Sequence, residues 1–404
     1  MIQPLTGIRV LDLTSVLMGP YTTQLLGDMG ADVIKVEARD GDSTRRIGPS
    51  RNDGMGAMFL NLNRNKRSIV LDLKHPSGRA AILRLAASCD LFVHSMRPET
   101  ISRLGLDYPN ICGVRPDVIY CGTYGYARNN PDHSRPAYDD LIQAASGMAA
   151  LQGKLAGTEP QYVGTVLADK SAGLEATVAI LAALMHRART GEGQAVDVAM
   201  YETMAAFLMV EHLAGWTFEP PIGDAGYGRV LSSKRHPYKA RDGYIAVLPY
   251  TDHHWRCFFT IAGRPELAAD PRFSSLSVRS ENIDSLYRLL EEIILGRTVL
   301  EWIDALDQVG IPVAPVRTFD EVIATGRTPR SDLLNLTDHP TEGAIWHIGS
   351  PMTFSHTPTS IRRHAPQLGR HGIEVLSEAG FVREEIEALR QLGVLVCNTE
   401  DDLG

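Results

Sequence analysis

Short apolar segments alternate with amphipathic segments along the first half of the chain. Ile8–Val16 (IRVLDLTSV) and Ala31–Ala38 (ADVIKVEA) are brief runs rich in branched apolar residues, which is typical of buried strands. The intervening segment Pro20–Gly30 begins with proline and ends with glycine, as helices commonly do. A strand, a helix and a strand within about thirty residues form a right-handed βαβ unit, which predicts a parallel sheet.

The same alternation continues toward the middle of the chain. Further strands are predicted at 67–74, 89–95 and 117–126, and a helix is predicted at 76–88. The pattern therefore predicts an α/β fold in which the first half of the chain is a Rossmann-like domain built on a parallel sheet.

A long buried helix is predicted from Lys170 to about Arg189, because small and apolar residues recur there at helical spacing. Asp169 stands directly before this segment, where a carboxylate can accept hydrogen bonds from the free N–H groups of a helix start. The local pattern favours this capping role for Asp169, and a catalytic role is the alternative that it leaves open.

Changes in composition divide the remainder of the chain. Residues 217–238 (TFEPPIGDAGYGRVLSSKRHPY) are rich in Gly, Pro and Ser, as linkers and mobile ligand loops are. From about Ser331 the chain is expected to be irregular until a final amphipathic helix at 382–394. The predicted organisation is a large domain at 1–200, a linker at 201–225, a small α+β domain at 226–325 and a return segment at 326–404 that completes the large domain.

Bulk composition limits the classes of partner. The 404 residues are 44% hydrophobic and 22% charged, with a net charge of −8, which argues against nucleic acid as the main partner. The five cysteines are scattered without a C-x-x-C pair, which suits a reducing compartment and predicts no zinc site. Because we find neither a signal-peptide pattern nor an apolar stretch long enough to span a bilayer, we expect a cytoplasmic protein with no membrane partner.

Several common chemistries lack their motifs. The first strand-to-helix turn (TSVLMGPYTTQLLG) has one glycine where a dinucleotide fingerprint needs three closely spaced glycines, which argues against a nicotinamide enzyme. The thirteen histidines show no metal-ligand spacing. Neither a G-x-S-x-G turn nor a P-loop occurs.

Cations gather around two strands of the first half, with a run before and after the strand in NLNRNKRSIVLDLK and two more after the strand CDLFVHS. A solvated turn accounts for such a run about as well as a phosphate site does, but the carboxyl ends of strands are where α/β sheets bind ligands. The clustering therefore modestly favours a site for a polyanionic ligand. The cations are Arg64, Lys66, Arg67, Lys74, Arg97 and Arg103.

A set of motifs occurs in order along nearly the whole chain, including GADVIKVEARDGDSTR, NRNKRSIVLDLK, AYDDLIQAASG, ADKSAGLEATVAILAAL, RTGEGQAVDVAM, YKARDGYIAV and APQLGRHGIEVLSEAGF. Taken together, these motifs resemble those of the class III CoA-transferases, the family of formyl-CoA transferase, carnitine CoA-transferase and α-methylacyl-CoA racemase. The resemblance implies an interlocked, ring-like homodimer with a Rossmann-like large domain and a smaller domain.

The resemblance also implies a site. Asp169 would be the nucleophile that attacks an acyl-CoA thioester, giving a mixed anhydride and then an aspartyl-CoA thioester. CoA would enter as a substrate thioester with no tightly bound cofactor and no metal, and the loop at Gly226–Gly228 would close over the site. The residues implied to surround CoA are Val16, Leu71, Lys74, Met96, Arg97, Arg103 and Tyr138.

Departures from the family pattern bear on the substrate. Leu17 stands where formyl-CoA transferases carry glutamine, which argues against an oxalate or formate preference. Tyr138 stands where racemases carry a histidine base, so transferase chemistry is favoured and an acyl-CoA racemase or epimerase is the alternative. A small dicarboxylate such as succinate is one guess for the acceptor, prompted by Arg46, Lys234 and Arg235. A catalytically silent CoA-binding protein is a third hypothesis, which the Asp169–Lys170 pair disfavours.

Overall fold

The computed structural model describes residues 2–328 and 331–397, and these residues form two compact units. The first unit contains the described residues up to Ser146, then Gly164–Ala206, and the described residues from Gly326 onward. The second unit contains Gly147–Val163 and Phe207–Thr325. Residues 147–163, which lie inside the range expected for the large domain, thus group with the second unit.

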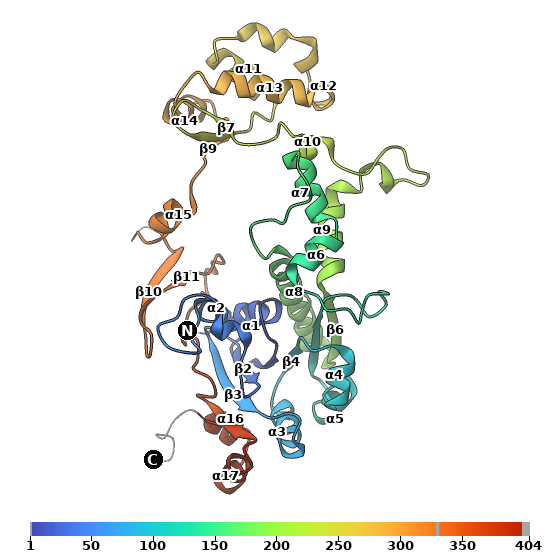
Figure 1. Cartoon of the computed structure of the whole chain (residues 1–404), viewed down its shortest axis with the longest axis vertical. Coiled ribbons are helices and arrows are strands. Elements are labelled where there is room, and N and C mark those ends of the chain that lie inside the picture. The colour runs from blue at the N-terminus through green and yellow to red at the C-terminus, as the bar shows by residue number, and fades with distance from the viewer. Residues whose placement is uncertain (1, 329–330, 398–404) are drawn as a thin grey trace. The chain divides into compact units, whose positions relative to one another are not determined.

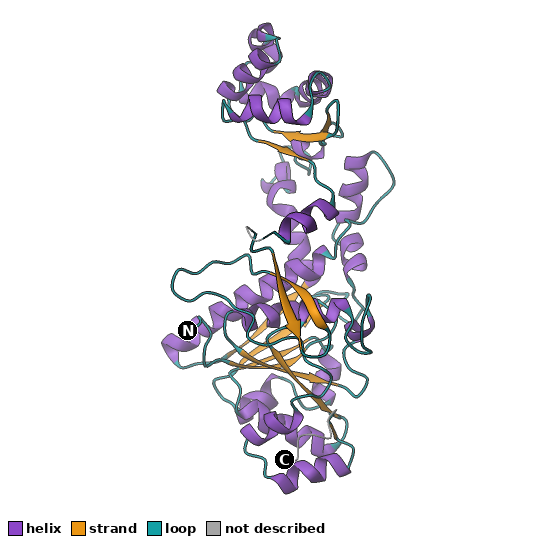
Figure 2. Cartoon of the chain, turned by 90° about the vertical axis from the view of Figure 1, so that its left-hand side faces the viewer, coloured by secondary structure: helices purple, strands orange, loops and turns teal. Residues whose placement is uncertain are grey.

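A seven-stranded sheet forms the centre of the first unit (Figures 1 and 2). Its strand order is β12-β3-β2-β1-β4-β5-β6, and β1 to β6 are mutually parallel, which confirms the predicted parallel α/β sheet. The strands are β1 (Arg9–Leu13), β2 (Asp32–Glu37), β3 (Lys66–Leu71), β4 (Leu91–His94), β5 (Ile119–Tyr124), β6 (Gln194–Ala199) and β12 (Leu395–Val396).

Helices cover this sheet because apolar side chains of the buried strands need partners above and below. On one face Leu11, Ile69 and Phe92 share a core with α3 and with the C-terminal helices. Elsewhere in the unit α1 packs against α8. The helices of this unit are α1 (Met18–Asp28), α2 (Ala57–Leu62), α3 (Pro76–Ala87), α4 (Pro98–Arg103), α5 (Tyr108–Val114), α6 (Asp139–Ala145), α8 (Leu167–Thr190), α16 (Gly372–Glu378) and α17 (Arg383–Gln391), with the short 3-10 helix η1 (Ser43–Arg46).

The C-terminal part of the chain returns to the first unit. The final amphipathic helix is present as α17, and β12 pairs antiparallel with β3. Expecting only irregular chain after Ser331 was wrong, because β10 (Leu334–His339) and β11 (Gly343–Ile348) form an antiparallel hairpin. The predicted return segment also includes residues 329–330 and 398–404, which lie outside the described residues.

Histidine side chains gather beside this hairpin. His347 Nε2 lies 3.3 Å from His364 Nδ1, and the rings of His339 and His364 are 5.1 Å apart at their centroids. Burial, and then the positive charge of Arg64, lower the pKa of His347 to about 4. This side chain is therefore neutral at pH 7.

The second unit is α+β, with an aromatic core that includes Phe258, Phe259 and Trp302. The linker expected at 201–225 is instead partly helical: α9 covers Met200–His212 and η2 covers Ala214–Thr217. The remaining elements are α7 (Met148–Ala156), α10 (Gly228–Leu231), β7 (Tyr238–Lys239), β8 (Tyr244–Val247), α11 (Asp252–Ile261), η3 (Pro265–Ala269), η4 (Pro271–Phe273), α12 (Leu276–Glu281), α13 (Ile283–Ile294), α14 (Val299–Asp307) and β9 (Val313–Pro315), while α15 (Phe319–Gly326) lies at the boundary with the first unit.

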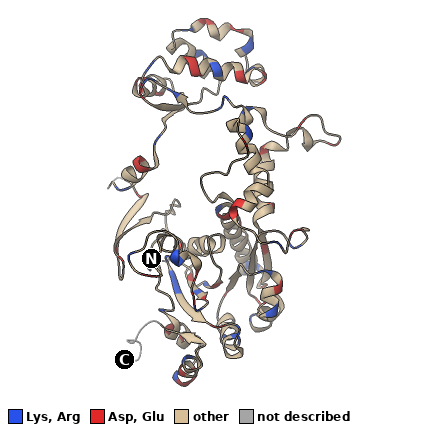
Figure 3. Cartoon of the chain, viewed as in Figure 1, with Lys and Arg blue, Asp and Glu red and all other residues tan. Residues whose placement is uncertain are grey.

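The helices of both units are mixed in charge, and their hydropathy bears on membrane contact. Lys and Arg are interspersed with Asp and Glu along the helices of both units (Figure 3). Among residues 2–328 and 331–397, none of the helices combines the length and the apolar composition that crossing a membrane requires.

Candidate functional site

Asp169 lies in the first turn of α8 but does not cap it. The helix begins at Leu167, with Val166 at the capping position, so the predicted capping role of Asp169 is wrong. Its carboxylate instead accepts a hydrogen bond from the backbone N–H of Met18, with 3.2 Å between Met18 N and Asp169 Oδ1. Met18 is the first residue of α1. The carboxylate therefore meets the N-terminal ends of two helices, where partial positive charge favours an anion.

A close approach between these two helices sets this geometry. A Cβ atom added to Gly173 of α8 would lie 2.9 Å from the Met18 carbonyl oxygen, so a larger residue has no room there. Thr22 of α1 reinforces the approach, because its hydroxyl donates a hydrogen bond to the Gly173 carbonyl at 3.0 Å. The small residues that follow Asp169 thus let the start of α8 contact the start of α1.

A second carboxylate adjoins Asp169 and contributes to its electrostatics. Asp139, at the start of α6, accepts a hydrogen bond from the backbone N–H of Asp169 at 3.1 Å and another from Gln143 Nε2 at 2.5 Å. Burial, and then the negative charge of Asp139, raise the pKa of the Asp169 carboxyl to about 6, while the Met18 N–H acts in the opposite direction. A carboxylate with a raised pKa is mostly ionised at pH 7 and is a better nucleophile than an ordinary aspartate.

Lys170 does not direct its ammonium at the neighbouring carboxylate. Lys170 Nζ donates a hydrogen bond to Thr165 Oγ1 at 2.5 Å, in the residues just before α8. The two side chains of the Asp–Lys pair therefore make separate contacts. Lys170 binds Thr165 just before α8, and Asp169 contacts the first residue of α1.

A large cavity opens in the first unit beside the carboxyl ends of β2 and β3. Its volume is about 1230 Å³, and its lining includes Leu71, Lys74, Met96 and Arg103. These four are among the residues that the resemblance assigns to CoA. Glu37, Asp40 and Asp72 line it as well. Its apolar and cationic side chains are the chemistry needed for a ligand with an aromatic base and phosphates.

The other three expected CoA contacts do not line this cavity. Val16 lies in the loop between β1 and α1, and Arg97 occupies the capping position of α4, directly after Met96. Tyr138 is 65% exposed and precedes α6. Their contact with CoA remains a prediction.

Two cations of the cavity were missed in the sequence. Arg39 follows β2, and Arg79 lies in the first turns of α3. Arg39 occurs within the motif GADVIKVEARDGDSTR, and its place directly after a strand was the available signal. Arg79 has no comparable signal, because an exposed arginine in an amphipathic helix is ordinary.

A buried histidine fixes the turn that carries Met96. His94 Nδ1 accepts a hydrogen bond from the Met96 N–H at 3.2 Å, and burial lowers the pKa of His94 to about 4. The next residue, Ser95, connects this turn to the β1–α1 loop, because its hydroxyl accepts a hydrogen bond from the Ser15 N–H at 3.1 Å. His94 was not predicted from the sequence to be part of the site.

The glycine loop belongs to the second unit. Gly226 has a φ of +108°, and its N–H donates to the His212 carbonyl at 2.8 Å. Gly228 begins the short helix α10. The role of this loop as a flap remains a prediction.

These features define an α/β protein with a carboxylate of raised pKa at a helix start and a large cavity at the carboxyl edge of its sheet. Comparison with known proteins adds the family. Residues 5–372 match the model of CoA-transferase family III, and the chain belongs to this family of enzymes.

Curated relatives and a solved structure agree with this assignment. The succinyl-CoA:glutarate CoA-transferase of Mus musculus is 33% identical over 97% of this chain and 90% of the relative. The formyl-CoA:oxalate CoA-transferase of Streptomyces avermitilis is 31% identical over 98% of this chain and 100% of the relative. The crystal structure of a CAIB/BAIF family protein from Brucella suis has a TM-score of 0.76 and 31% identity, covering 94% of this chain and 100% of that one.

Proposed function

We propose that this enzyme moves CoA from an acyl-CoA donor to a carboxylic acid acceptor, with Asp169 as the nucleophile. The observation that carries the proposal is the Asp169 carboxylate, half-buried with a raised pKa and held by the Met18 N–H at 3.2 Å. Desolvation raises its reactivity, and the helix starts around it stabilise negative charge that develops during acyl transfer.

The proposed reaction has four steps, and each step breaks one bond at an acyl carbonyl and forms another. The Asp169 carboxylate attacks the donor thioester carbonyl, the C–S bond breaks, and CoA leaves as a thiolate from a mixed anhydride. The thiolate attacks the aspartyl carbonyl of that anhydride, which releases the donor acid and forms an aspartyl-CoA thioester. The acceptor carboxylate then attacks this thioester and expels the thiolate again. Finally the thiolate attacks the acceptor's acyl carbonyl, which gives the new acyl-CoA and restores the Asp169 carboxylate.

The cavity beside β2 and β3 is the proposed site for the nucleotide end of CoA. Lys74 and Arg103 would contact phosphates, together with Arg39 and Arg79. Leu71 and the neighbouring apolar residues would pack against the adenine. The pantetheine arm would then run along the β1–α1 loop toward Asp169.

A small dicarboxylate is the acceptor class that we propose. The support is the name of the murine relative, which pairs succinyl-CoA with glutarate. The three cations that first prompted the idea carry less weight. Arg46 already donates to the Asp40 carbonyl at 2.7 Å, and Lys234 lies 3.7 Å from Glu291. Arg235 lines a separate cavity of about 480 Å³ in the second unit.

A homodimer, interlocked as in the family that the chain resembles, is part of the proposal, as is a cytoplasmic location. The support for a second copy is an apolar stripe on α8. Leu174, Val178 and Met185 are 50%, 60% and 67% exposed. Apolar side chains in such a row are typical of a covered interface.

Chemical trapping tests the nucleophile. After mixing with acyl-CoA, hydroxylamine or borohydride should modify Asp169, and peptide mass spectrometry should locate the label there. Asp140→Asn, which changes an exposed acid next to Asp139, should be labelled like the wild type. An active enzyme that stays unlabelled at Asp169 contradicts the proposal. Deuterium uptake at the α-carbon without acyl exchange would instead favour the racemase alternative.

A further inference from the structure

One residue of the β1–α1 loop adopts an unfavourable backbone conformation. Val16 has a φ of +69°, in the left-handed region that β-branched residues rarely occupy. It lies two residues before Met18, whose N–H contacts the Asp169 carboxylate. A conformation of this kind persists only where the surrounding structure imposes it, and it is frequent at functional sites. The neighbours that impose it therefore affect where the Met18 N–H points.

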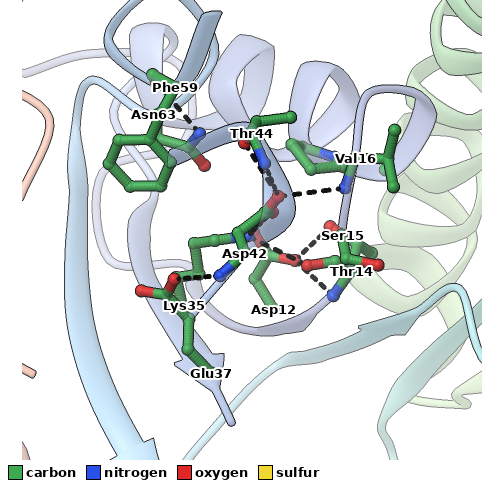
Figure 4. A network of polar contacts seen from close by, with 12 residues as sticks. Asp12, Thr14, Ser15, Val16, Lys35, Glu37, Asp42, Thr44, Phe59 and Asn63 are labelled. Carbon is green, nitrogen blue, oxygen red and sulfur yellow. Dashed lines mark hydrogen bonds and ion pairs between the residues drawn. The ribbon is translucent and has the colours of Figure 1, made fainter. Parts of the chain in front are cut away.

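An ion pair holds the loop on both sides of Ser15 (Figure 4). Asp42 Oδ1 accepts a hydrogen bond from the Val16 N–H at 3.3 Å, and Asp42 Oδ2 lies 2.9 Å from Lys35 Nζ. The same Lys35 ammonium donates to the Thr14 carbonyl at 2.9 Å. A carboxylate on one side and an ammonium on the other thus fix the backbone before and after Ser15.

This ion pair is itself rigidly held. The side chains of Lys35 and Asp42 are 0% and 1% exposed. Asp42 Oδ1 also accepts hydrogen bonds from the Thr44 N–H at 2.9 Å and the Thr44 hydroxyl at 2.8 Å, and the Asp42 N–H donates to Glu37 Oε2 at 2.9 Å. Away from water, such a network has a single favourable arrangement, because every alternative leaves a charge unpaired.

We propose that Asp42, fixed by Lys35, is a positioning residue for Asp169. It holds Val16 in the left-handed conformation, and this directs the Met18 N–H at the Asp169 carboxylate. The inference rests on the proposed function, since it takes Asp169 as the reacting group. Asp42 acts through the backbone and does not contact the reacting atoms.

The Met18 hydrogen bond does two things for the nucleophile. It stabilises the ionised carboxylate against burial and against the charge of Asp139, and it fixes the orientation of the carboxylate that would attack the thioester. The position of the Met18 N–H depends on a loop whose conformation is strained. Small displacements of a reacting group cost large factors in rate, so release of this loop lowers kcat more than it weakens substrate binding.

Substitution of Asp42 tests the inference. For Asp42→Ala we expect kcat to fall by roughly 10- to 100-fold while the KM for acyl-CoA changes much less. The acid limb of the kcat–pH profile moves to higher pH, because the Asp169 carboxylate loses a donor. Asp42→Asn keeps an acceptor oxygen for the Val16 N–H but removes the charge opposite Lys35. We therefore expect kcat to fall less in Asp42→Asn than in Asp42→Ala.

A matched variant separates positioning from general destabilisation. Asp28, the last residue of α1, forms a buried ion pair with Arg64 at 2.7 Å. We expect Asp28→Asn to lower the free energy of unfolding, as the Asp42 variants do, but to leave kcat and the acid limb unchanged. The acid limb is the decisive readout, because a merely structural role for Asp42 would not move it.

A substitution at Val16 tests directly whether Asp42 acts through the backbone conformation of this residue. Glycine adopts positive φ without strain, so Val16→Gly in the Asp42→Ala or Asp42→Asn background should recover part of kcat. The inference is overturned if the Asp42 variants retain wild-type kcat and acid limb, or if Val16→Gly restores nothing. Trapping at Asp169 in the wild type distinguishes this failure from failure of the proposed function, which would leave Asp169 unlabelled in an active enzyme.

Discussion

The backbone N–H of Asp169 donates a hydrogen bond to Asp139 Oδ1, so the start of α8 is tied to a second carboxylate at the start of α6. This neighbour acts against ionisation of Asp169 by like-charge repulsion, and the Met18 N–H acts in favour of it. Together with burial, which raises this pKa most, the two groups set the pH at which the Asp169 carboxyl ionises.

Asp139→Asn should therefore change the pH dependence of the enzyme. The amide keeps an oxygen for the Asp169 N–H but removes the negative charge, so the pKa of Asp169 falls toward its ordinary value. We expect the acid limb of the kcat/KM profile to move to lower pH. Asp140→Asn is the control, because this neighbouring carboxylate is exposed. An unmoved acid limb in Asp139→Asn would show that the charge of Asp139 does not reach the nucleophile.

Asp169→Asn should make the protein more stable while abolishing turnover. The pKa of Asp169 is raised in the folded state, so between about pH 4 and pH 6 the native protein binds more protons than the unfolded chain, and stability falls as pH rises. Asparagine avoids this loss. After allowance for partial exposure we expect a gain of about 1–2 kcal/mol at pH 8 and little difference at pH 4. Urea unfolding at both pH values measures it, and an equal gain at both would contradict the assignment.

The cations of the large cavity should affect binding rather than chemistry. Lys74→Ala and Arg103→Ala each remove one charge-assisted contact, so the KM for acyl-CoA should rise about tenfold with little change in kcat. Steady-state kinetics at two salt concentrations checks this, because phosphate contacts weaken with salt. Arg135→Ala, which removes an exposed arginine paired with Asp132, serves as the control. A fall in kcat at constant KM would place these side chains elsewhere in the reaction.

His347 should make the protein sensitive to acid. Its pKa is lowered in the folded state, so the unfolded chain binds more protons between about pH 4 and pH 6.5, and stability is lost as pH falls through this window. We expect this group to account for about 2–3 kcal/mol between pH 7 and pH 4. His347→Phe keeps an aromatic ring without the titration. The pH dependence of unfolding should flatten in this variant, and an unchanged slope would assign it to other groups.

The stripe on α8 should control assembly. Val178→Glu places a charge among Leu174 and Met185, so a covering partner would have to bury it unpaired. Subunits threaded through each other cannot separate once folded, so we expect the variant, when refolded from denaturant, to give less dimer in sedimentation than the wild type. Glu192→Gln, just beyond the helix, should refold to the wild-type yield of dimer. An equal yield from Val178→Glu would exclude this face as the interface.

The parallel sheet was predicted well from the sequence because the strands β1 to β5 are almost entirely buried. Continuous branched apolar runs as short as those of β1 and β2 are seldom compatible with any other element. The hairpin β10–β11 was missed because its strands are partly exposed and mix polar with apolar residues, as irregular segments also do. The two-residue β12 carries no pattern by itself and is defined only by its partner β3.

The candidate site was predictable in part. Leu71, the last residue of β3, and Met96, which follows β4, were assigned to the site through the family resemblance, and both line the cavity. The contact between Met18 and Asp169 joins residues far apart in the chain, and no local spacing encodes it. The capping role assigned to Asp169 was wrong because α8 starts earlier than its apolar periodicity indicated, which moved the carboxylate into the first turn.

The pairing of β12 with β3 has a consequence for how the protein is made. The outer edge of β3 pairs with Leu395 and Val396, which follow both β3 and the whole second unit in the chain and are therefore synthesised later than either. During translation this edge therefore waits with unsatisfied amide and carbonyl groups while the whole second unit emerges. A nascent chain stalled before Leu395 should bind chaperones that recognise open strand edges. These chaperones should dissociate once Leu395 and Val396 have been synthesised and pair with β3.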